Sequence, residues 1–359
     1  MYFLVVFTKH LRTGLSLLIG SILTHISFAG TDLFIGGQFG LDGYFINRPT
    51  TLPYSQTAIS GASNFLGVDF ISRTEGWLAG KDGSVYYSST AGSSWTNQTI
   101  SGGGNFNSVD FVNSNTGWVS GTSGEIWKTS NGGNSFTLQD STSALTLRSI
   151  KFYDDQTGWA VGQAGTILST LDGGSNWAAQ TSGTDKNLNS VYFVSDTTGW
   201  AVGGKDDLNI ILKTTNGGTT WTEQTNITND NNEILRAVFF ANANDGWIAG
   251  SGGTTGWTND GGTTWSIVQF ETLHTFRGLG FVSDTKGWVV GDDGAAYKTS
   301  DGGLTWNLEG GIHITADLRA ISVHDTASVP EASHLVLFIG LTATLFTAIR
   351  RKKRVSPRN

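Results

Sequence analysis

The sequence predicts an all-β protein, a seven-bladed β-propeller whose blades are four-stranded antiparallel sheets. Three observations predict this fold. A Gly-Trp pair recurs in steps of 41, 41, 41, 47 and 41 residues. An octet of the type Thr214 to Trp221 follows each Gly-Trp pair, with a central Gly-Gly pair in five octets and Ala91-Gly92 in the first. Short alternating apolar stretches lie between glycine-rich turns, and a period near 40 residues with four short strands is typical of one propeller blade.

Tryptophans occupy two fixed positions of the repeat. The Gly-Trp position holds Trp77, Trp118, Trp159, Trp200, Trp247 and Trp288. The last position of the octet holds Trp95, Trp177, Trp221, Trp265 and Trp306, with Phe136 in the second repeat. A buried tryptophan removes roughly 150–250 Å² from water, so we interpret both sets as core residues that hold neighbouring blades together. A ligand-stacking platform is the alternative.

The octet has the chemistry of a hairpin turn. Its Gly-Gly pair permits positive φ, and the preceding Asp or Asn accepts hydrogen bonds from nearby backbone N–H groups. Asp172, Asp260 and Asp301 alternate at this position with Asn131 and Asn216. Because the charge is dispensable, we predict a structural role rather than metal ligation or acid–base chemistry.

The first strands of the repeats number seven. They centre on Val68, Val109, Ile150, Val191, Val238, Leu279 and Ile321. In the third repeat the four strands are expected at residues 148–152, 158–162, 166–170 and 177–180. The last first strand, 318–323, precedes the C-terminal tail, and its missing partners match residues 33–37, 43–47 and 54–57. One blade shared by both termini would close a ring of seven blades, and six or eight blades are the alternatives.

The two ends of the chain predict export. Residues 1–29 resemble a secretory signal peptide, with Lys9 and Arg12 before an apolar stretch. The propeller is expected to span residues 30–326. Residues 327–359 form a tail with a short apolar helix at 335–349 and a basic cluster at 350–354. With Pro330 and Glu331 in front, this tail resembles the PEP-CTERM sorting tail, which implies an exosortase-type processing enzyme and transient membrane association. A simple C-terminal anchor is the alternative, and Ala332 departs from the family's second proline.

Composition excludes several classes of function. The chain has no cysteine, which excludes disulfides and thiol chemistry. His274, His313 and His324 show no metal-ligand spacing, so we expect neither a metal nor a cofactor. Without residues 1–29 and 334–359, 14 basic residues face 29 acidic ones. This acidic balance argues against a nucleic-acid ligand.

The octets resemble Asp-boxes, which occur in sialidases, related glycoside hydrolases and non-catalytic propellers. Together with the Gly-Trp-x-x-Gly strand, such as Gly158 to Gly162, the whole of residues 31–325 resembles the photosystem II stability and assembly factor family. The resemblance implies a seven-bladed propeller that binds assembly intermediates and catalyses nothing. A sialidase would require an Arg-Ile-Pro segment, and the sequence has none.

Four arginines share one repeat position, two residues before the centre of the first strand: Arg148, Arg236, Arg277 and Arg319. Leu66, Asn107 and Asn189 take this position in the other repeats. Since equivalent positions form a ring, we expect the guanidinium groups to gather at one mouth of the channel. They could capture carboxylates, as the arginine patch proposed for the family would. Alternatively each pairs with an acid of a neighbouring blade, such as Asp69 or Asp110.

The sequence therefore predicts an exported, monomeric, non-catalytic propeller at the cell envelope, the cell surface or outside the cell. Its partner would be a protein or a polysaccharide. The alternative is a carbohydrate-active enzyme that uses acids of the fourth repeat's insertions, either Asp206 with Asp207 or Asp230 with Glu233. Adjacent acids in such loops are more often solvated.

Overall fold

The computed structural model describes residues 31–39, 42–48, 55–59, 64–139, 141–206, 208–224, 233–309 and 316–325. Thr31–His324 forms one compact unit. The expected signal peptide, the sorting motif with its tail, Asp207 and Asp230 lie outside the described residues. Within the described residues, no helix has the length and apolarity needed to cross a membrane.

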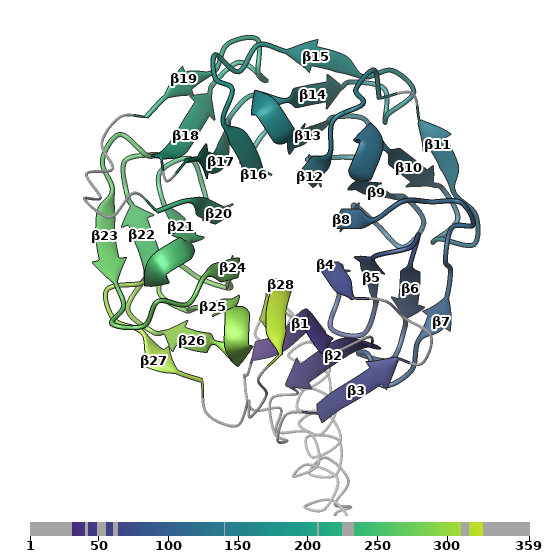
Figure 1. Cartoon of the computed structure of the whole chain (residues 1–359), viewed down its shortest axis with the longest axis horizontal. Coiled ribbons are helices and arrows are strands. Elements are labelled where there is room, and N and C mark those ends of the chain that lie inside the picture. Colours follow the sequence, from purple (N-terminus) through teal and green to yellow (C-terminus); the bar gives the residue numbers. More distant parts are fainter. Residues whose placement is uncertain are drawn as a thin grey trace, which may run out of the picture. The chain divides into compact units, whose positions relative to one another are not determined.

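The described unit is a ring of four-stranded antiparallel sheets around a central channel (Figure 1). In the first three blades the strands are β4 (Phe65–Phe70), β5 (Gly76–Gly80), β6 (Val85–Ser88), β7 (Thr96–Asn97); β8 (Phe106–Phe111), β9 (Gly117–Gly121), β10 (Ile126–Thr129), β11 (Thr137–Gln139); and β12 (Leu147–Phe152), β13 (Gly158–Gly162), β14 (Ile167–Thr170), β15 (Ala178–Gln180). The third blade thus has the four strands expected from its sequence, each within one residue of the expected bounds.

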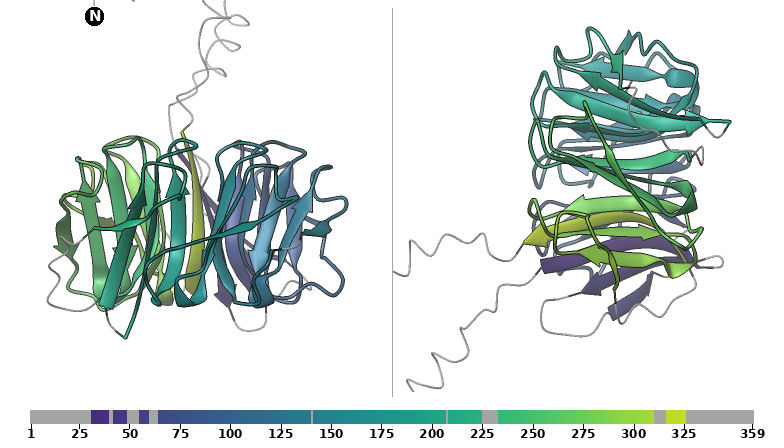
Figure 2. Two further views of the ribbon diagram at one scale, coloured as in Figure 1. Left: turned by 90° about the horizontal axis from the view of Figure 1, so that it is seen from above. Right: turned by 90° about the vertical axis from the view of Figure 1, so that its left-hand side faces the viewer.

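The next three blades repeat this order. Their strands are β16 (Asn187–Phe193), β17 (Gly199–Lys205), β18 (Leu208–Thr214), β19 (Thr222–Glu223); β20 (Leu235–Phe240), β21 (Gly246–Gly250), β22 (Thr254–Thr258), β23 (Ser266–Gln269); and β24 (Phe276–Phe281), β25 (Gly287–Gly291), β26 (Ala296–Thr299), β27 (Asn307–Leu308). The first strand of each blade faces the channel, and the blades stand side by side around it (Figure 2).

The predicted count of seven blades is wrong, because the structure has six repeat blades. Six sheets are repeat blades, each formed by four consecutive strands of the chain. The remaining sheet is composite and has the order β28-β1-β2-β3, from β28 (Asp317–Asp325), β1 (Thr31–Phe39), β2 (Asp42–Arg48) and β3 (Ser55–Ile59). It lacks both the Gly-Trp pair and the octet. The fold is therefore six repeat blades plus one sheet that joins the two ends of the described unit.

The composite sheet is bonded to the first blade. The hydroxyl of Ser322 on β28 accepts a hydrogen bond from the backbone N–H of Phe70 at 3.2 Å. The ring of His324 donates to the carbonyl of Phe70. These two bonds link the last described strand to the first repeat blade and so close the ring.

Aromatic rings join each blade to the next. The Gly-Trp tryptophans are buried, and five of them stack on the phenylalanine that ends the first strand of the following blade, as Trp118 does on Phe152 at 3.4 Å. The octet tryptophan of that blade meets the same phenylalanine edge-on, as Trp177 does at 5.8 Å. Both sets of tryptophans therefore lie between or within blades, which is the predicted core role.

The indole nitrogens extend this contact to the octet turns. Trp118 Nε1 donates to the carbonyl of Gly173, the first glycine of the next blade's turn, at 3.1 Å. The tryptophans at 77, 159, 200 and 247 do the same at 2.8–3.2 Å. Each turn is also bonded internally: Asp172 accepts from Thr170, and Gly174 N–H donates to the Thr170 hydroxyl. These internal hydrogen bonds fix the octet turn, so that its first glycine carbonyl can accept the hydrogen bond from the tryptophan of the preceding blade.

Candidate functional site

A bulge in the first strand of each repeat blade creates the position that three of the four arginines occupy. The pairing of β12 with β13 shifts between Leu147 and Ser149, which leaves Arg148 without a partner residue. The same shift occurs at Arg236 and Arg277, and at Leu66, Asn107 and Asn189 in the other repeat blades. A bulge re-aims the side chain of its extra residue.

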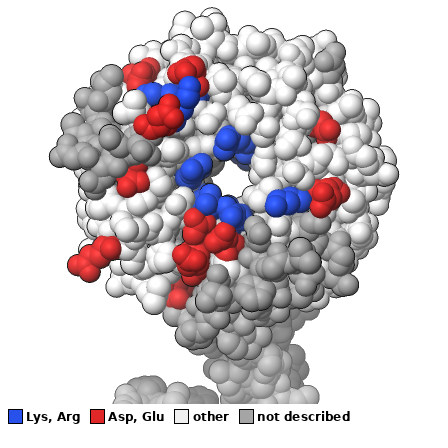
Figure 3. Space-filling model, in the orientation of Figure 1, with Lys and Arg blue, Asp and Glu red and all other residues white. Residues whose placement is uncertain are grey.

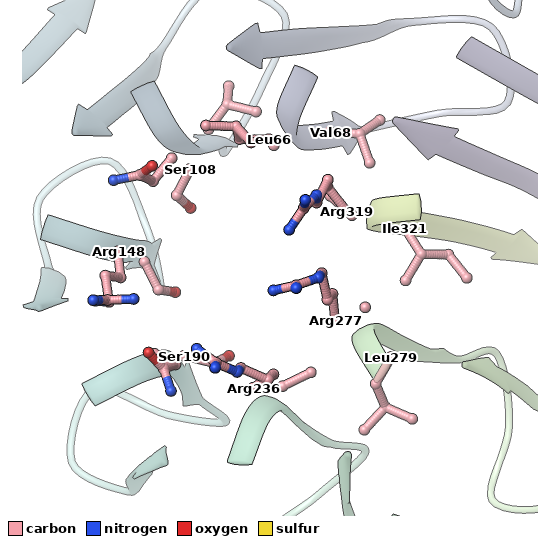
Figure 4. Close-up of a pocket in the computed structure, with 18 of the residues that line it drawn as sticks. Leu66, Val68, Ser108, Arg148, Ser190, Arg236, Arg277, Leu279, Arg319 and Ile321 are labelled. Carbon is pink, nitrogen blue, oxygen red and sulfur yellow. The ribbon is translucent and has the colours of Figure 1, made fainter. Parts of the chain in front are cut away.

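The four arginines line one cavity of about 470 Å³ at the channel. Figure 4 shows Arg277 and Arg319 pointing into it, with Arg148 and Arg236 on other strands at its wall. In the space-filling view, basic side chains surround the central opening on this face (Figure 3). The predicted gathering of these side chains is thus present in the structure.

Two of the arginines have acidic partners of their own. Arg277 binds Asp292 with two hydrogen bonds, of 2.5 Å from Nε and 2.9 Å from a terminal nitrogen. Asp292 begins the short turn η5 (Asp292–Gly294), whose backbone is bonded to the residue before β24. Arg319 donates to Asp317, two residues before it on β28, at 2.6 Å. These pairs neutralise one side of the cavity.

The suggested pairing of the arginines with Asp69 or Asp110 is wrong. Asp110 binds the ammonium group of Lys151 at 2.5 Å and accepts the backbone N–H of Phe152. Asp69 accepts the N–H of Phe111 on the next blade at 2.7 Å. Both acids hold neighbouring first strands together instead. Burial, followed by the charge of Asp110, raises the pKa of Asp69 to about 7.

Arg148 and Arg236 lack such partners. Among the described residues, neither forms a salt bridge, and the buried Nε of each has no hydrogen-bond acceptor. Burial lowers the pKa of both guanidinium groups, and for Arg236 the charges of Arg277 and Arg148 lower it further. Two partly buried cations without counter-ions favour an anionic ligand.

The asparagines at the bulge position brace the backbone beside these two arginines. Asn107 Nδ2 donates to the carbonyl of Leu147, directly before Arg148, at 2.7 Å. Asn189 Nδ2 donates in the same way to the carbonyl of Leu235, before Arg236, at 2.7 Å. Sequence reasoning missed this role, although both asparagines share the repeat position of the arginines.

The acids of the alternative enzyme hypothesis do not meet in this cavity. Glu233 accepts a hydrogen bond from the Ser251 hydroxyl at 2.5 Å, and Asp206 lies in an exposed turn with φ of 52°. Neither lines the arginine cavity. Within the described residues, no group of three or more His, Asp or Glu side chains is placed to hold a metal ion.

Repeat blades with glycine-rich octet turns, arranged around a channel with a cationic mouth, define an Asp-box β-propeller. The chain belongs to the family described as photosynthesis system II assembly factor YCF48. The model of this family matches residues 46–140 and 175–274, which together make up more than half of the chain. A comparison with curated proteins gives no match.

Solved structures share the fold. YCF48 bound to a D1 peptide has a TM-score of 0.58 and 21% identity, over 72% of this chain and 92% of that one. YCF48 from Cyanidioschyzon merolae has a TM-score of 0.59 and 20% identity, over 74% and 90%. An ancestral GH74 enzyme has a TM-score of 0.55 and 16% identity, over 81% and 40%. Since one fold hosts many activities, these likenesses concern architecture alone.

Proposed function

We propose that this protein is an exported, non-catalytic propeller that binds a protein partner through carboxylate groups held in the arginine cavity. The observation that carries the proposal is the absence of a described acidic partner for Arg148 and Arg236, in a cavity that Arg277 and Arg319 share. A carboxylate entering here would form charge-assisted, bidentate hydrogen bonds, which are stronger than neutral ones.

A peptide is the partner that fits this site best. The cavity of about 470 Å³ is large enough for a few side chains, and its walls combine guanidinium groups with the aliphatic Val68, Leu279 and Ile321. A similar propeller, YCF48, has been solved with a D1 peptide. Membership of an assembly factor family supports a client that is a photosystem II assembly intermediate.

The test is the binding of that D1 peptide to the purified protein, measured by fluorescence anisotropy. We expect saturable binding that weakens as salt rises, because ion pairs at a partly exposed mouth are screened. The same peptide with its carboxylates converted to methyl esters should bind at least tenfold more weakly. Equal binding of the esterified peptide would contradict the proposal, as would binding of an acidic polysaccharide such as polygalacturonate in preference to the peptide.

Export and processing form a separate part of the proposal. The apolar N-terminal segment and the tail with Pro330 and Glu331 support passage to the envelope or surface, with removal of the tail by an exosortase-type enzyme. Cell fractionation and mass spectrometry of the mature ends test this part. A protein that keeps residues 1–29 and stays inside the cell would contradict it.

A further inference from the structure

A second cavity, of about 230 Å³, lies between the fifth and sixth repeat blades. The residues that line it include Trp247 and Trp257 together with Asp245, Asp284 and Asp301. No lysine or arginine lines this cavity among the described residues. It is separate from the arginine cavity, with which it shares no lining residue.

At two other interfaces between repeat blades the equivalent position is occupied by a lysine of the chain itself, whereas Tyr87 and Ser169 hold it at the remaining two. Lys128 on β10 pairs across the sheet with Trp118, and its ammonium group lies 5.3 Å from the centre of that ring. The same ammonium lies over Gly173, the first glycine of the next octet turn, where an added Cβ would be 2.7 Å from Nζ. The face of the tryptophan ring and the acidic octet turn therefore form a binding site for a cation.

The fourth and fifth blades repeat this arrangement. Lys213 pairs with Trp200, its Nζ lies 5.4 Å from the ring centre, and an added Cβ at Gly261 would be 2.7 Å from it. Burial lowers the pKa of Lys213, and the charge of Asp260, in the octet of the fifth blade, partly opposes this shift. Two independent interfaces of this chain thus place an ammonium group at the same position.

Between the fifth and sixth blades the lysine is replaced. Trp257 occupies the position of Lys128 and Lys213, paired across the sheet with Trp247. An added Cβ at Gly302, the first glycine of the sixth octet, would meet the carbonyl of Asp284 at 3.0 Å but no lysine atom. No lysine ammonium group lies at this position, and the cavity of about 230 Å³ is found here instead.

The acidic groups remain after the cation is lost. Asp301 is held in the octet turn by Thr299 and Thr305, and these hydrogen bonds keep its pKa low, so it is charged at neutral pH. Asp284 comes from the loop before β25, and Asp245 directly precedes β21. The interface with the sixth octet therefore has three aspartates beside two tryptophans, without the ammonium group that Lys128 and Lys213 place at two other interfaces.

We propose that this cavity binds an alkylammonium group from outside the chain, in the form of a lysine side chain of a partner protein. Trp257 and Trp247 provide apolar and aromatic contact for the methylenes and the cation, and the three carboxylates supply the counter-charge. The proposal does not depend on the function assigned to the arginine cavity.

The probe is Nα-acetyl-lysine methylamide, titrated into the full chain while the indole ¹H–¹⁵N resonances of the tryptophans are followed. We expect saturable shifts of the Trp257 and Trp247 resonances. The neutral isostere Nα-acetyl-norleucine methylamide should leave them unchanged. Shifts of equal size with the neutral probe, or none with the lysine probe, would overturn the proposal.

Two variants sharpen the test. Trp257→Lys restores the residue found at the equivalent position of the second and fourth blades, so the internal ammonium should fill the site and abolish probe binding. Asp284→Asn keeps the shape of an exposed side chain, and we expect it to weaken the probe about threefold. Asp196→Asn, in the corresponding loop of the fourth blade, is the matched control and should bind as wild type does. Undiminished binding in both Trp257→Lys and Asp284→Asn would place the probe elsewhere and refute the site.

Discussion

The indole nitrogen of Trp288 donates a hydrogen bond of 2.9 Å to the carboxylate of Glu309. The five other Gly-Trp tryptophans donate to a glycine carbonyl of the next octet turn instead. The sheet that follows the sixth blade is the composite one, which has no octet. Glu309 therefore supplies, from the sixth blade itself, the acceptor that the next blade supplies elsewhere.

Replacement of Glu309 should reveal this role. Glu309→Gln keeps an oxygen acceptor for Trp288, whereas Glu309→Ala leaves a buried indole N–H unpaired, which costs about 1–3 kcal/mol. Urea denaturation should show the larger loss of unfolding free energy for Glu309→Ala. Equal losses would show that the charge near Lys298, 3.4 Å away, matters more than the bond to the indole.

Trp200 tests the contact between blades. It is fully buried, stacks on Phe240 at 3.5 Å and donates to the carbonyl of Gly261 at 3.0 Å. Trp200→Phe should cost about 1–3 kcal/mol of unfolding free energy, because the stacking survives and the carbonyl loses its donor. Trp200→Ala should cost about 3–5 kcal/mol. As the control, replacement of the exposed Leu304 by alanine should change the unfolding free energy by less than about 0.5 kcal/mol.

The raised pKa of Asp69 makes stability depend on pH near neutrality. The carboxyl group of Asp69 has a pKa of about 7 in the folded protein, against 3.8 in the unfolded chain. It therefore binds its proton more tightly in the folded state. Its contribution is therefore complete below pH 4 and is lost as the pH rises through 7. In Asp69→Asn, the fall in unfolding free energy between pH 5 and pH 8 should be smaller than in wild type. Parallel curves for the two proteins would refute this assignment.

The aspartates of the octets make the stability depend on pH in the opposite direction, since they stabilise the fold more as the pH rises. Hydrogen bonds from Thr264 lower the pKa of Asp260 from 3.8 to about 2, so its contribution is present above pH 4 and is lost as the pH falls toward 2. Asn131 and Asn216 hold the same place in other octets. Asp260→Asn should thus melt near the wild-type temperature at pH 7 and lose less stability at pH 3. A large loss at pH 7 would mean that the charge itself is required.

The features of the fold that recur in every repeat could be predicted from the sequence. The 41-residue steps identified the strands, the octet turns and both sets of tryptophans, since each follows from local pattern and burial. The composite sheet was also predicted, from the match of residues 318–323 to a first strand. Counting it as a seventh blade was the error, because the packing of a sheet without an octet against its neighbours has no local sequence signal.

The partners of the site residues could not be predicted in this way. The shared position of Arg148 and Arg236 indicated a ring, but the bulge that places them at the cavity wall depends on pairing with the second strand. Asp292 lies 15 residues from Arg277 in sequence, and only the turn after β25 brings it back. The pairing of Asp110 with Lys151 joins two blades, and that contact has no local signal.

The most direct test of the account is the affinity of the D1 peptide for Arg148→Asn/Arg236→Asn, measured by fluorescence anisotropy. Asparagine occupies the same bulge in two other blades, so the fold should persist. We predict at least a tenfold loss of affinity, since each lost charge-assisted hydrogen bond is worth about 1.5–3 kcal/mol. The control Arg73→Gln, an exposed arginine outside the cavity, should bind as wild type does. Wild-type affinity in the folded double variant would contradict the claim that this cavity is the binding site.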